Sequence, residues 1–516
     1  MDFLSGEKTS MSSWVDAQPA RLSSLGVLAV VLLALTAGIA VLAFGVVALL
    51  GVLGVLAFIL FLRAPIVGVF ATTALLLLSG SAGVIGPTGP QIASYVTVAK
   101  LCGVVAFAAW IVNFLVRRLR YTLTREVVLM VAFLLWALVG VLYSPYCAQQ
   151  LPEWFRFASL IAFLVMTADV LSQGENSRRN VHNYIILLLV CGAISASFAL
   201  VQYLTPSRYA ISLAERFDIA RQTGAVVDPE SMLGIAPARV SGRALHSNWL
   251  ALLMLCVLPL NVYWFQVSKT WRMRGLICAA AFIELCALVL TFTRTGFMVG
   301  CVLIIVMALK GLLRANPYRF VALALVVVLG WTVLPAAYKE RVLNFSKYST
   351  SESVGARVEL QSAAWRYATE HPICGVGLGG FGMHFIRENS NTAHIMKYAV
   401  EHFRWNPLFV GVHDLYLQIA CETGFIGLAV FLVVFVLMMR NLWVAQGKFA
   451  AAGDEPFRVV CSALQVSLVA FLLCSVFLHA LQQKILWIVA AAAITVSLHE
   501  SVMRSPEHKE SERSVH

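Results

Sequence analysis

The chain has 516 residues, of which 60% are apolar and only 12% are charged, and its mean hydropathy is +0.83. This composition excludes an ordinary soluble globular protein and predicts a membrane protein that crosses the bilayer many times. The formal net charge of +12 is spread over the predicted cytoplasmic loops, so it indicates orientation in the membrane and requires no nucleic-acid partner.

Apolar runs long enough to cross a bilayer, about 20 residues each, recur from residue 25 almost to the C-terminus. The first run, residues 25–62, is too long for a signal peptide and is interpreted as two helices, 25–44 and 45–62. Further spans are predicted at residues 65–83, 93–115, 126–143, 154–172, 182–203, 246–265, 275–292, 295–313, 318–335, 415–439, 457–479 and 482–499. The predicted fold class is therefore all-α, a polytopic bundle of about 12 to 14 transmembrane helices.

Residues 25–499 are interpreted as a single transmembrane domain between two cytoplasmic tails, residues 1–24 and 500–516. With this orientation most lysines and arginines of the short connections lie inside, as the positive-inside rule requires. Two long connections, 205–245 and 336–412, then lie on the periplasmic side. Long irregular connections are usually functional or disordered.

The second long connection contains a helical apolar rhythm over residues 354–370, which ends before Pro372. A short helix on or near the membrane surface is predicted there. Residues 375–382 (GVGLGGFG) supply flexible backbone. They do not indicate a nucleotide-binding loop, because no strand-then-helix unit surrounds them.

Most of the eleven cysteines lie inside apolar runs, where they are expected to be small buried hydrophobic side chains. Cys147 and Cys374 are predicted on the outer face, and whether they form a disulfide is left open by the sequence.

Arginines occur where the hydrophobic runs break on the predicted outer face: Arg239, Arg243, Arg294 and Arg357. Arg294 lies in a tight turn between two apolar helices, where a charge is costly and usually implies a function or a partner. Arg239 and Arg243 precede a helix whose N-terminal amides face the same compartment, a combination that attracts anions. The alternatives are interfacial arginines that reach headgroup phosphates and, for Arg357, a solvated helix face.

His413 begins a segment with further polar side chains at Asp414, Gln418 and Glu422, which then continues into an apolar helix. Helical spacing places Gln418 and Glu422 on roughly the same side as the histidine. An imidazole exchanges protons near neutral pH, so His413 is a candidate general base. A purely structural histidine at a helix start is the alternative.

Several catalytic motifs are missing from the sequence. It contains no H-E-x-x-H, no paired-cysteine zinc pattern, no G-x-S-x-G and no P-loop. The sequence therefore does not favour a metal-dependent hydrolase, a serine hydrolase or an enzyme that hydrolyses nucleotides. Neither a metal site nor a cofactor is predicted.

Short motifs recur between residues 239 and 427: R-V-S-G from Arg239 with Asn248 at a helix start, T-F-T-R-T-G at 291–296, Arg357 with Trp365, H-P at 371–372, G-V-G-L-G from Gly375, and His413 followed by G-F-I-G from Gly424. Together they resemble the O-antigen ligase and O-antigen polymerase superfamily of bacterial polysaccharide assembly. One departure is Asp414, where such proteins commonly have Asn, Ser or Gln. A carboxylate there raises the basicity of the imidazole or marks a different acceptor.

The resemblance implies an inverting, metal-independent glycosyltransferase of the bacterial inner membrane with its active face in the periplasm. The implied donor is an undecaprenyl-diphosphate-linked glycan, and the implied acceptor is another glycan or a lipid A core, as in lipopolysaccharide or exopolysaccharide synthesis. The four arginines would bind the diphosphate. His413 would accept the proton of the attacking hydroxyl, and Asp414 and Glu422 would orient the imidazole or the acceptor.

The sequence leaves several functions open. A polymerase and a ligase differ only in the acceptor, and the long outer connection favours a polymerase. A transporter or flippase of lipid-linked glycans is the alternative from another class, although no internal repeat supports it. A non-catalytic scaffold is the third interpretation.

Overall fold

The structure, a computed structural model, describes residues 46–78, 97–117, 124–173, 176–205, 240–242, 246–310, 312, 339, 352–390, 392–394, 396–397, 410–479 and 481–502. All regular elements within these ranges are helices, so the predicted all-α fold class is confirmed. Eight of the described helices are long and apolar enough to cross a membrane, and four shorter apolar helices accompany them.

The long apolar helices are α4 (Val98–Arg117), α5 (Arg125–Tyr143), α6 (Cys147–Ser172), α7 (Ser177–Leu204), α11 (Ser247–Val267), α12 (Trp271–Leu290), α20 (Leu415–Ala451) and α21 (Glu455–Ser475). The shorter apolar helices are α2 (Val46–Arg63), α3 (Pro65–Leu78), α13 (Arg294–Leu309) and α22 (Lys484–Val502). Two spans predicted from the sequence, 25–44 and 318–335, lie outside the described residues. Each of the other predicted spans coincides with one of these helices.

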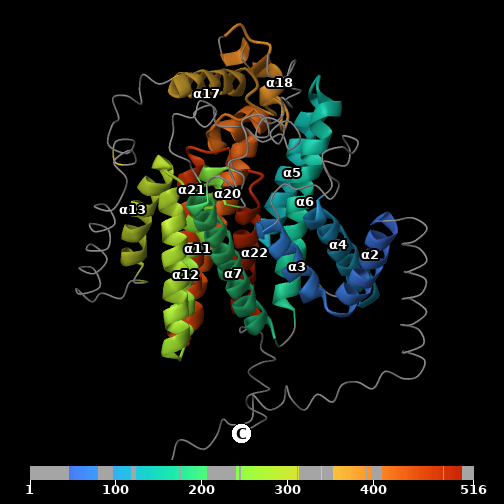
Figure 1. The fold of residues 1–516 in the computed structure, drawn as a ribbon. Helices are drawn as coiled ribbons and strands as arrows, with labels where there is room; N and C mark the ends of the chain where they lie inside the picture. The colour runs from blue at the N-terminus through green and yellow to red at the C-terminus, as the bar shows by residue number, and fades with distance from the viewer. Residues whose placement is uncertain are drawn as a thin grey trace, which may run out of the picture.

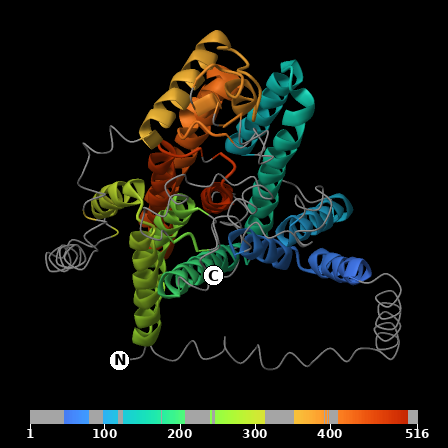
Figure 2. The same cartoon turned by 45° about the horizontal axis from the view of Figure 1, so that its top comes forward.

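Helix α22 lies at the centre of the bundle, with α20 and α21 on one side and α5 and α6 on the other (Figure 2). All its side chains over residues 485–496 are buried. Four consecutive alanines, residues 490–493, lie within this stretch. Helices in a membrane attract one another through close packing rather than through exclusion of water. Small residues such as these alanines allow that close packing.

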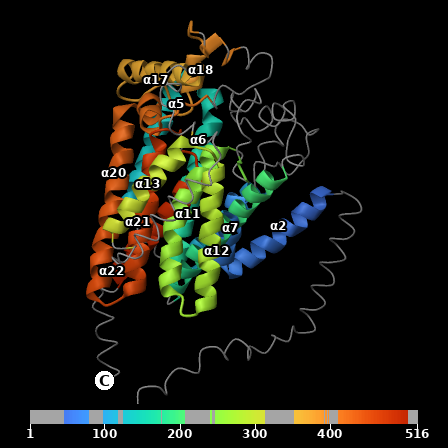
Figure 3. The same cartoon turned by 60° about the vertical axis from the view of Figure 1, so that its left-hand side comes forward.

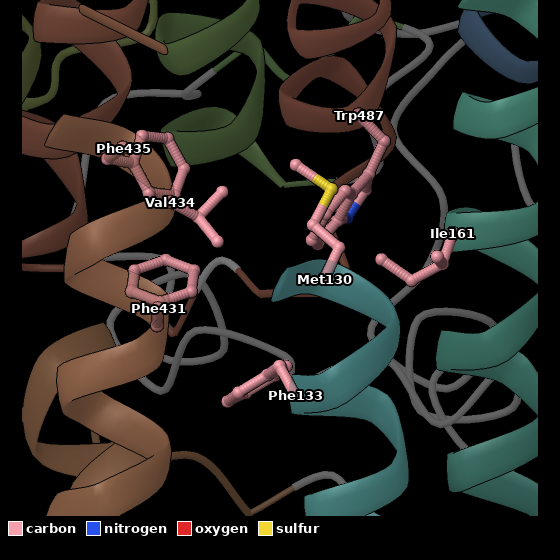
Figure 4. A pocket seen from close by; sticks show the side chains of 7 residues that line it. All are labelled: Met130, Phe133, Ile161, Phe431, Val434, Phe435 and Trp487. Carbon is pink, nitrogen blue, oxygen red and sulfur yellow. The ribbon is translucent and has the colours of Figure 1, made fainter. Parts of the chain in front are cut away.

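The peripheral helices expose large apolar side chains, such as Val104 and Leu115 on α4 and Leu276 and Phe282 on α12. Such a surface is suited to contact with lipid chains. Where α5, α6, α20 and α22 meet, a small gap is lined only by apolar side chains: Met130, Phe133, Ile161, Phe431, Val434, Phe435 and Trp487 (Figure 4). A gap without polar groups offers no specific binding chemistry.

Two further helices, α17 (Glu352–Glu370) and α18 (Phe381–Phe385), belong to the long connection before α20. The predicted helix at 354–370 is therefore confirmed as α17. It lies across one end of the bundle, next to the start of α20 (Figures 1 and 3). A small apolar core that includes Leu360, Phe381 and Val412 joins α17 and α18 to this end.

Helix α20 is interrupted at Gly424, which has a φ of 72° and a ψ of 176°. Glycine adopts this conformation readily because it has no Cβ, and here a Cβ would collide with the carbonyl of Ile373. The freed backbone groups find other partners. The amide of Phe425 donates to the Pro372 carbonyl at 2.8 Å, and Trp136 Nε1 donates to the Thr423 carbonyl at 2.9 Å. The kink thus attaches the segment after α17 to α20.

We predict that Gly424→Ala destabilises the protein, because the left-handed backbone and the collision with Ile373 together cost at least about 1–3 kcal/mol. Gly447→Ala is the matched control, since Gly447 lies in the same helix with open space around its Cβ position. It should stabilise α20 by about 0.5–1 kcal/mol. The measurement is the thermal unfolding midpoint of each variant in lipid nanodiscs. Equal midpoints for the two variants would contradict the role given to the kink.

Candidate active site

His413 lies two residues before α20 and has a φ of 60°. This left-handed conformation is uncommon for a residue with a side chain, and strained residues of this kind concentrate at functional sites. The next residue, Asp414, is the N-cap of α20, and its carboxylate accepts a hydrogen bond from the Leu417 amide at 2.9 Å. The cap defines where the helix begins and so where His413 is held.

Three histidines from separate parts of the chain form a histidine cluster here: His246, His413 and His479. The rings of His413 and His479 lie with centroids 5.2 Å apart and planes at 80°, an edge-on contact. The ring of Trp249 lies 6.4 Å from that of His479 and 5.8 Å from that of His246. His246 is also the N-cap of α11, since its Nδ1 accepts a hydrogen bond from the Asn248 amide at 3.2 Å.

Arg357, on α17, is close enough to His413 to act on it electrostatically, as are His479 and His246. Burial lowers the pKa of His413 well below its ordinary value, and the three basic neighbours lower it further. Burial also lowers the pKa of His479 to about 4. Both imidazoles are therefore unprotonated at neutral pH, which is the state in which a histidine accepts a proton.

The Nδ1 atoms of His413 and His479 are buried and have no hydrogen-bond partner within the described part of the chain, although both side chains keep part of their surface exposed. Buried polar atoms in proteins are nearly always paired, so two adjacent exceptions are notable. Because Nδ1 of His413 is enclosed, Nε2 is the nitrogen open to a ligand.

Arg294 is the first residue of α13, and its side chain is half-buried. Thr293 caps this helix: its Oγ1 accepts a hydrogen bond from the Gly296 amide at 3.2 Å and lies 3.0 Å from Thr291 Oγ1. Phe292 is buried with a φ of 50°, and among the described residues it and His413 are the two non-glycine residues with a positive φ.

The start of α13 packs against the start of α11. A Cβ at Gly296 would lie 3.2 Å from the Cβ of Ala251, one turn into α11. Because His246 caps α11, Arg294 lies at the same end of the bundle as the histidine cluster. The structure thus places Arg357 within electrostatic range of His413 and Arg294 at the same end of the bundle.

Arg239 and Arg243 lie outside the described residues. Residues 240–242, which lie between them, are described: the Val240 amide donates to the Leu290 carbonyl at 3.3 Å. The two following amides donate to Gln202 Oε1 at 3.1 and 3.0 Å. This segment is thereby held beside the turn that leads into α13.

Glu422 is buried, accepts a hydrogen bond from Gln418 Nε2 at 3.1 Å and interacts with the backbone of Gly379. It supports the glycine-rich segment, in which Gly375, Gly377 and Gly379 all have positive φ. Asp414 and Glu422 thus have structural roles as helix cap and loop support. Their predicted part in orienting the imidazole or the acceptor stays a prediction.

Side chains suited to metal binding do not gather in the described ranges: no group of three or more His, Cys, Asp or Glu there has the arrangement of a metal site. Cys147 and Cys374, whose pairing the sequence left open, are both free thiols.

Comparison with known proteins gives a match to the O-antigen ligase family over residues 279–432. The match supports the O-antigen ligase and polymerase superfamily for this stretch of the chain. The predicted resemblance is confirmed, and the O-antigen ligase stretch contains Arg294, Arg357 and His413, whereas His479 lies outside it. No curated protein matches the chain.

The O-antigen ligase stretch runs from α12 to the first half of α20, so it includes the turn before α13, α17 and the glycine-rich segment. Reasoning from sequence missed His246 and His479 as members of the site. His246 carried a signal, because it follows Arg243 closely and is the first residue of a predicted helix. His479 carried none, since it is the last residue of a predicted apolar span and has no neighbouring motif.

We predict that Thr293→Val lowers the free energy of unfolding by about 1–3 kcal/mol, because the buried Gly296 amide and Thr291 hydroxyl lose a partner. The matched control is Thr270→Val, which removes the exposed N-cap of α12. Water replaces the lost hydroxyl there, so the expected cost is about 0.5–1 kcal/mol. Chemical denaturation in detergent measures both. A cost at Thr293 no larger than at Thr270 would show that the turn before α13 is not held as described.

Proposed function

We propose that this protein is a membrane-embedded, inverting glycosyltransferase of the O-antigen ligase and polymerase type. It moves a glycan from a polyprenyl diphosphate onto a sugar hydroxyl at the periplasmic face of the bacterial inner membrane. The observation that carries the proposal is the placement of Arg357 within electrostatic range of His413, whose pKa is lowered by burial, inside the O-antigen ligase stretch.

The arginines are assigned to the diphosphate. As the bond from the anomeric carbon breaks, negative charge develops on the bridging oxygen of the departing diphosphate. A guanidinium donates paired hydrogen bonds to phosphate oxygens, and cations already held in place stabilise the transition state without reorganisation. We assign this role to Arg294 and Arg357, with Arg239 and Arg243 as further ligands, so the proposed reaction needs no divalent cation.

His413 is assigned as the general base. The acceptor hydroxyl attacks the anomeric carbon from the side opposite the diphosphate, which inverts the configuration, and its proton passes to Nε2 of His413. Protonation places a cation beside Arg357, which is unfavourable in the empty site. The diphosphate in the same site supplies the compensating negative charge.

The acceptor separates the two subclasses. Helix α17 and the start of α18 cover the end of the bundle at which α20 begins (Figure 1). This cover supports a polymerase that retains a growing glycan. The readout is the product: a lengthened lipid-linked glycan indicates a polymerase, and a decorated lipid A core indicates a ligase.

We predict that His413→Gln lowers the rate of glycan transfer by about 10²- to 10⁴-fold, the usual contribution of a general base. The assay uses purified protein in nanodiscs with a polyprenyl-diphosphate-linked oligosaccharide as donor. His394→Gln, at an exposed histidine of the same long connection, is the control and should keep the wild-type rate. Transfer by His413→Gln at the wild-type rate would remove the base from the mechanism, whereas a flippase or a scaffold would give no transfer even with the wild-type protein.

We predict that Arg357→Lys lowers transfer by about 10²- to 10³-fold, because lysine keeps the charge but loses the paired donors that stabilise the leaving group. Arg366→Lys is the matched control on the same helix, where the side chain pairs with Glu388. A chelator added to the wild-type protein should leave the rate unchanged. Loss of transfer in chelator would show that a divalent cation, and not the arginines alone, carries the charge.

A further inference from the structure

His479 has no part in the mechanism above, yet its ring contacts that of His413 directly. It lies in the connection between α21 and α22, outside the O-antigen ligase stretch. The contacts around it show that its position and that of His413 depend on each other.

The first contact is with the backbone that leads to His413. A Cβ at Gly411 would collide with the ring of His479, so only glycine lets the chain pass this closely. The residues on either side, Val410 and Val412, are buried, which fixes the path of the chain. The left-handed backbone at His413 follows directly after this passage.

The second contact is on another side of the ring, where Trp249 packs edge-on with its centroid 6.4 Å away and an interplanar angle of 75°. Trp249 lies in the first turn of α11. His479 is therefore held between the start of α11 and the segment before α20, and its buried Nδ1 has no hydrogen-bond partner in the described residues. Packing of the ring, rather than hydrogen bonding of that nitrogen, accounts for its placement.

We propose that His479 is a positioning residue for His413 in the glycosyl transfer proposed above: its edge-on ring sets the plane of the His413 ring and excludes water from Nδ1, so that Nε2 faces the acceptor hydroxyl. The inference rests on the proposed function for its role in catalysis. The pairing of the two rings stands on the contacts alone.

The charges around His413 give the pairing a pH signature. The groups that face it are His479 from the α21–α22 connection, Arg357 from α17 and His246 from the start of α11, all basic. The carboxylate of Asp414, next in the chain, is bound to the Leu417 amide. Removal of the His479 ring admits water to the imidazole of His413, which weakens the effect of burial and raises the pKa of His413 towards its ordinary value of about 6.5.

The test compares three variants. His479→Ala removes the ring, His479→Phe keeps a ring that does not titrate, and Gly411→Ala keeps the imidazole but displaces it. His394→Ala is the control at an exposed histidine. Two quantities are measured for each: the pH profile of kcat/KM for transfer, and the pKa of His413 in substrate-free protein by NMR of labelled imidazole nitrogens, assigned by its loss in His413→Gln.

His479→Ala should lower kcat by about 10²-fold, the loss typical of a small misplacement of a catalytic group. A general base must be unprotonated, so activity is lost as the pH falls through its pKa. Because that pKa rises in His479→Ala, the acid limb of the profile should move to higher pH. Gly411→Ala should behave in the same way, whereas His479→Phe should stay close to wild type in both rate and acid limb.

An unchanged acid limb and an unchanged NMR pKa in His479→Ala would overturn the proposal, because a merely structural residue alters the amount of active protein and not its titration. A His479→Phe variant as impaired as His479→Ala would also overturn it, since packing of a ring would then be insufficient. The NMR titration needs no substrate. If transfer is lost in His413→Gln but unchanged in His479→Ala, only this inference fails. If the NMR pKa of His413 rises in His479→Ala but the wild-type protein transfers no glycan, only the proposed function fails.

Discussion

Inside a bilayer, backbone amides and carbonyls must find partners within the protein, and a chain can leave the helical pattern only where other groups replace the lost hydrogen bonds. The break in α20 at Gly424 meets this condition because Trp136 and the Pro372 carbonyl bind the freed groups. The same junction attaches the segment after α17 to the helix that follows His413. These two hydrogen bonds, which involve neither Arg357 nor His413, help to hold α17 and its Arg357 against the part of the chain that carries His413.

The histidine cluster and Arg357 bring positive or titratable basic groups together at one partly buried end of the bundle. Among the described residues, the neighbours that act electrostatically on His413 are all basic: His479, Arg357 and His246. In such a setting an imidazole stays neutral until an anion arrives, because burial and like charges both disfavour its protonation. An anionic donor would then favour the proton uptake that its own reaction requires. This reciprocity between ligand and proton follows from linkage and needs no conformational change.

The acidic side chains near His413 contribute chiefly to architecture. Asp414 stabilises the first turn of α20 through the Leu417 amide, and Glu422 is buried against Gln418 and the glycine-rich segment. A carboxylate next to a catalytic histidine in sequence need not lie against its ring, because the helix cap turns it towards the backbone.

The sequence by itself determined the membrane-spanning helices, the helix in the long connection, and the candidate roles of Arg294, Arg357 and His413. Hydropathy, helix caps and costly charges at helix ends are local properties that neighbouring residues reveal. Only the tertiary structure decided that His479 packs against His413. By sequence His479 is the last residue of a predicted apolar span, and nothing in the residues around it marks it as part of a site. Its role depends on the packing of α11, α20, α21 and α22, which brings three distant connections to one end of the bundle.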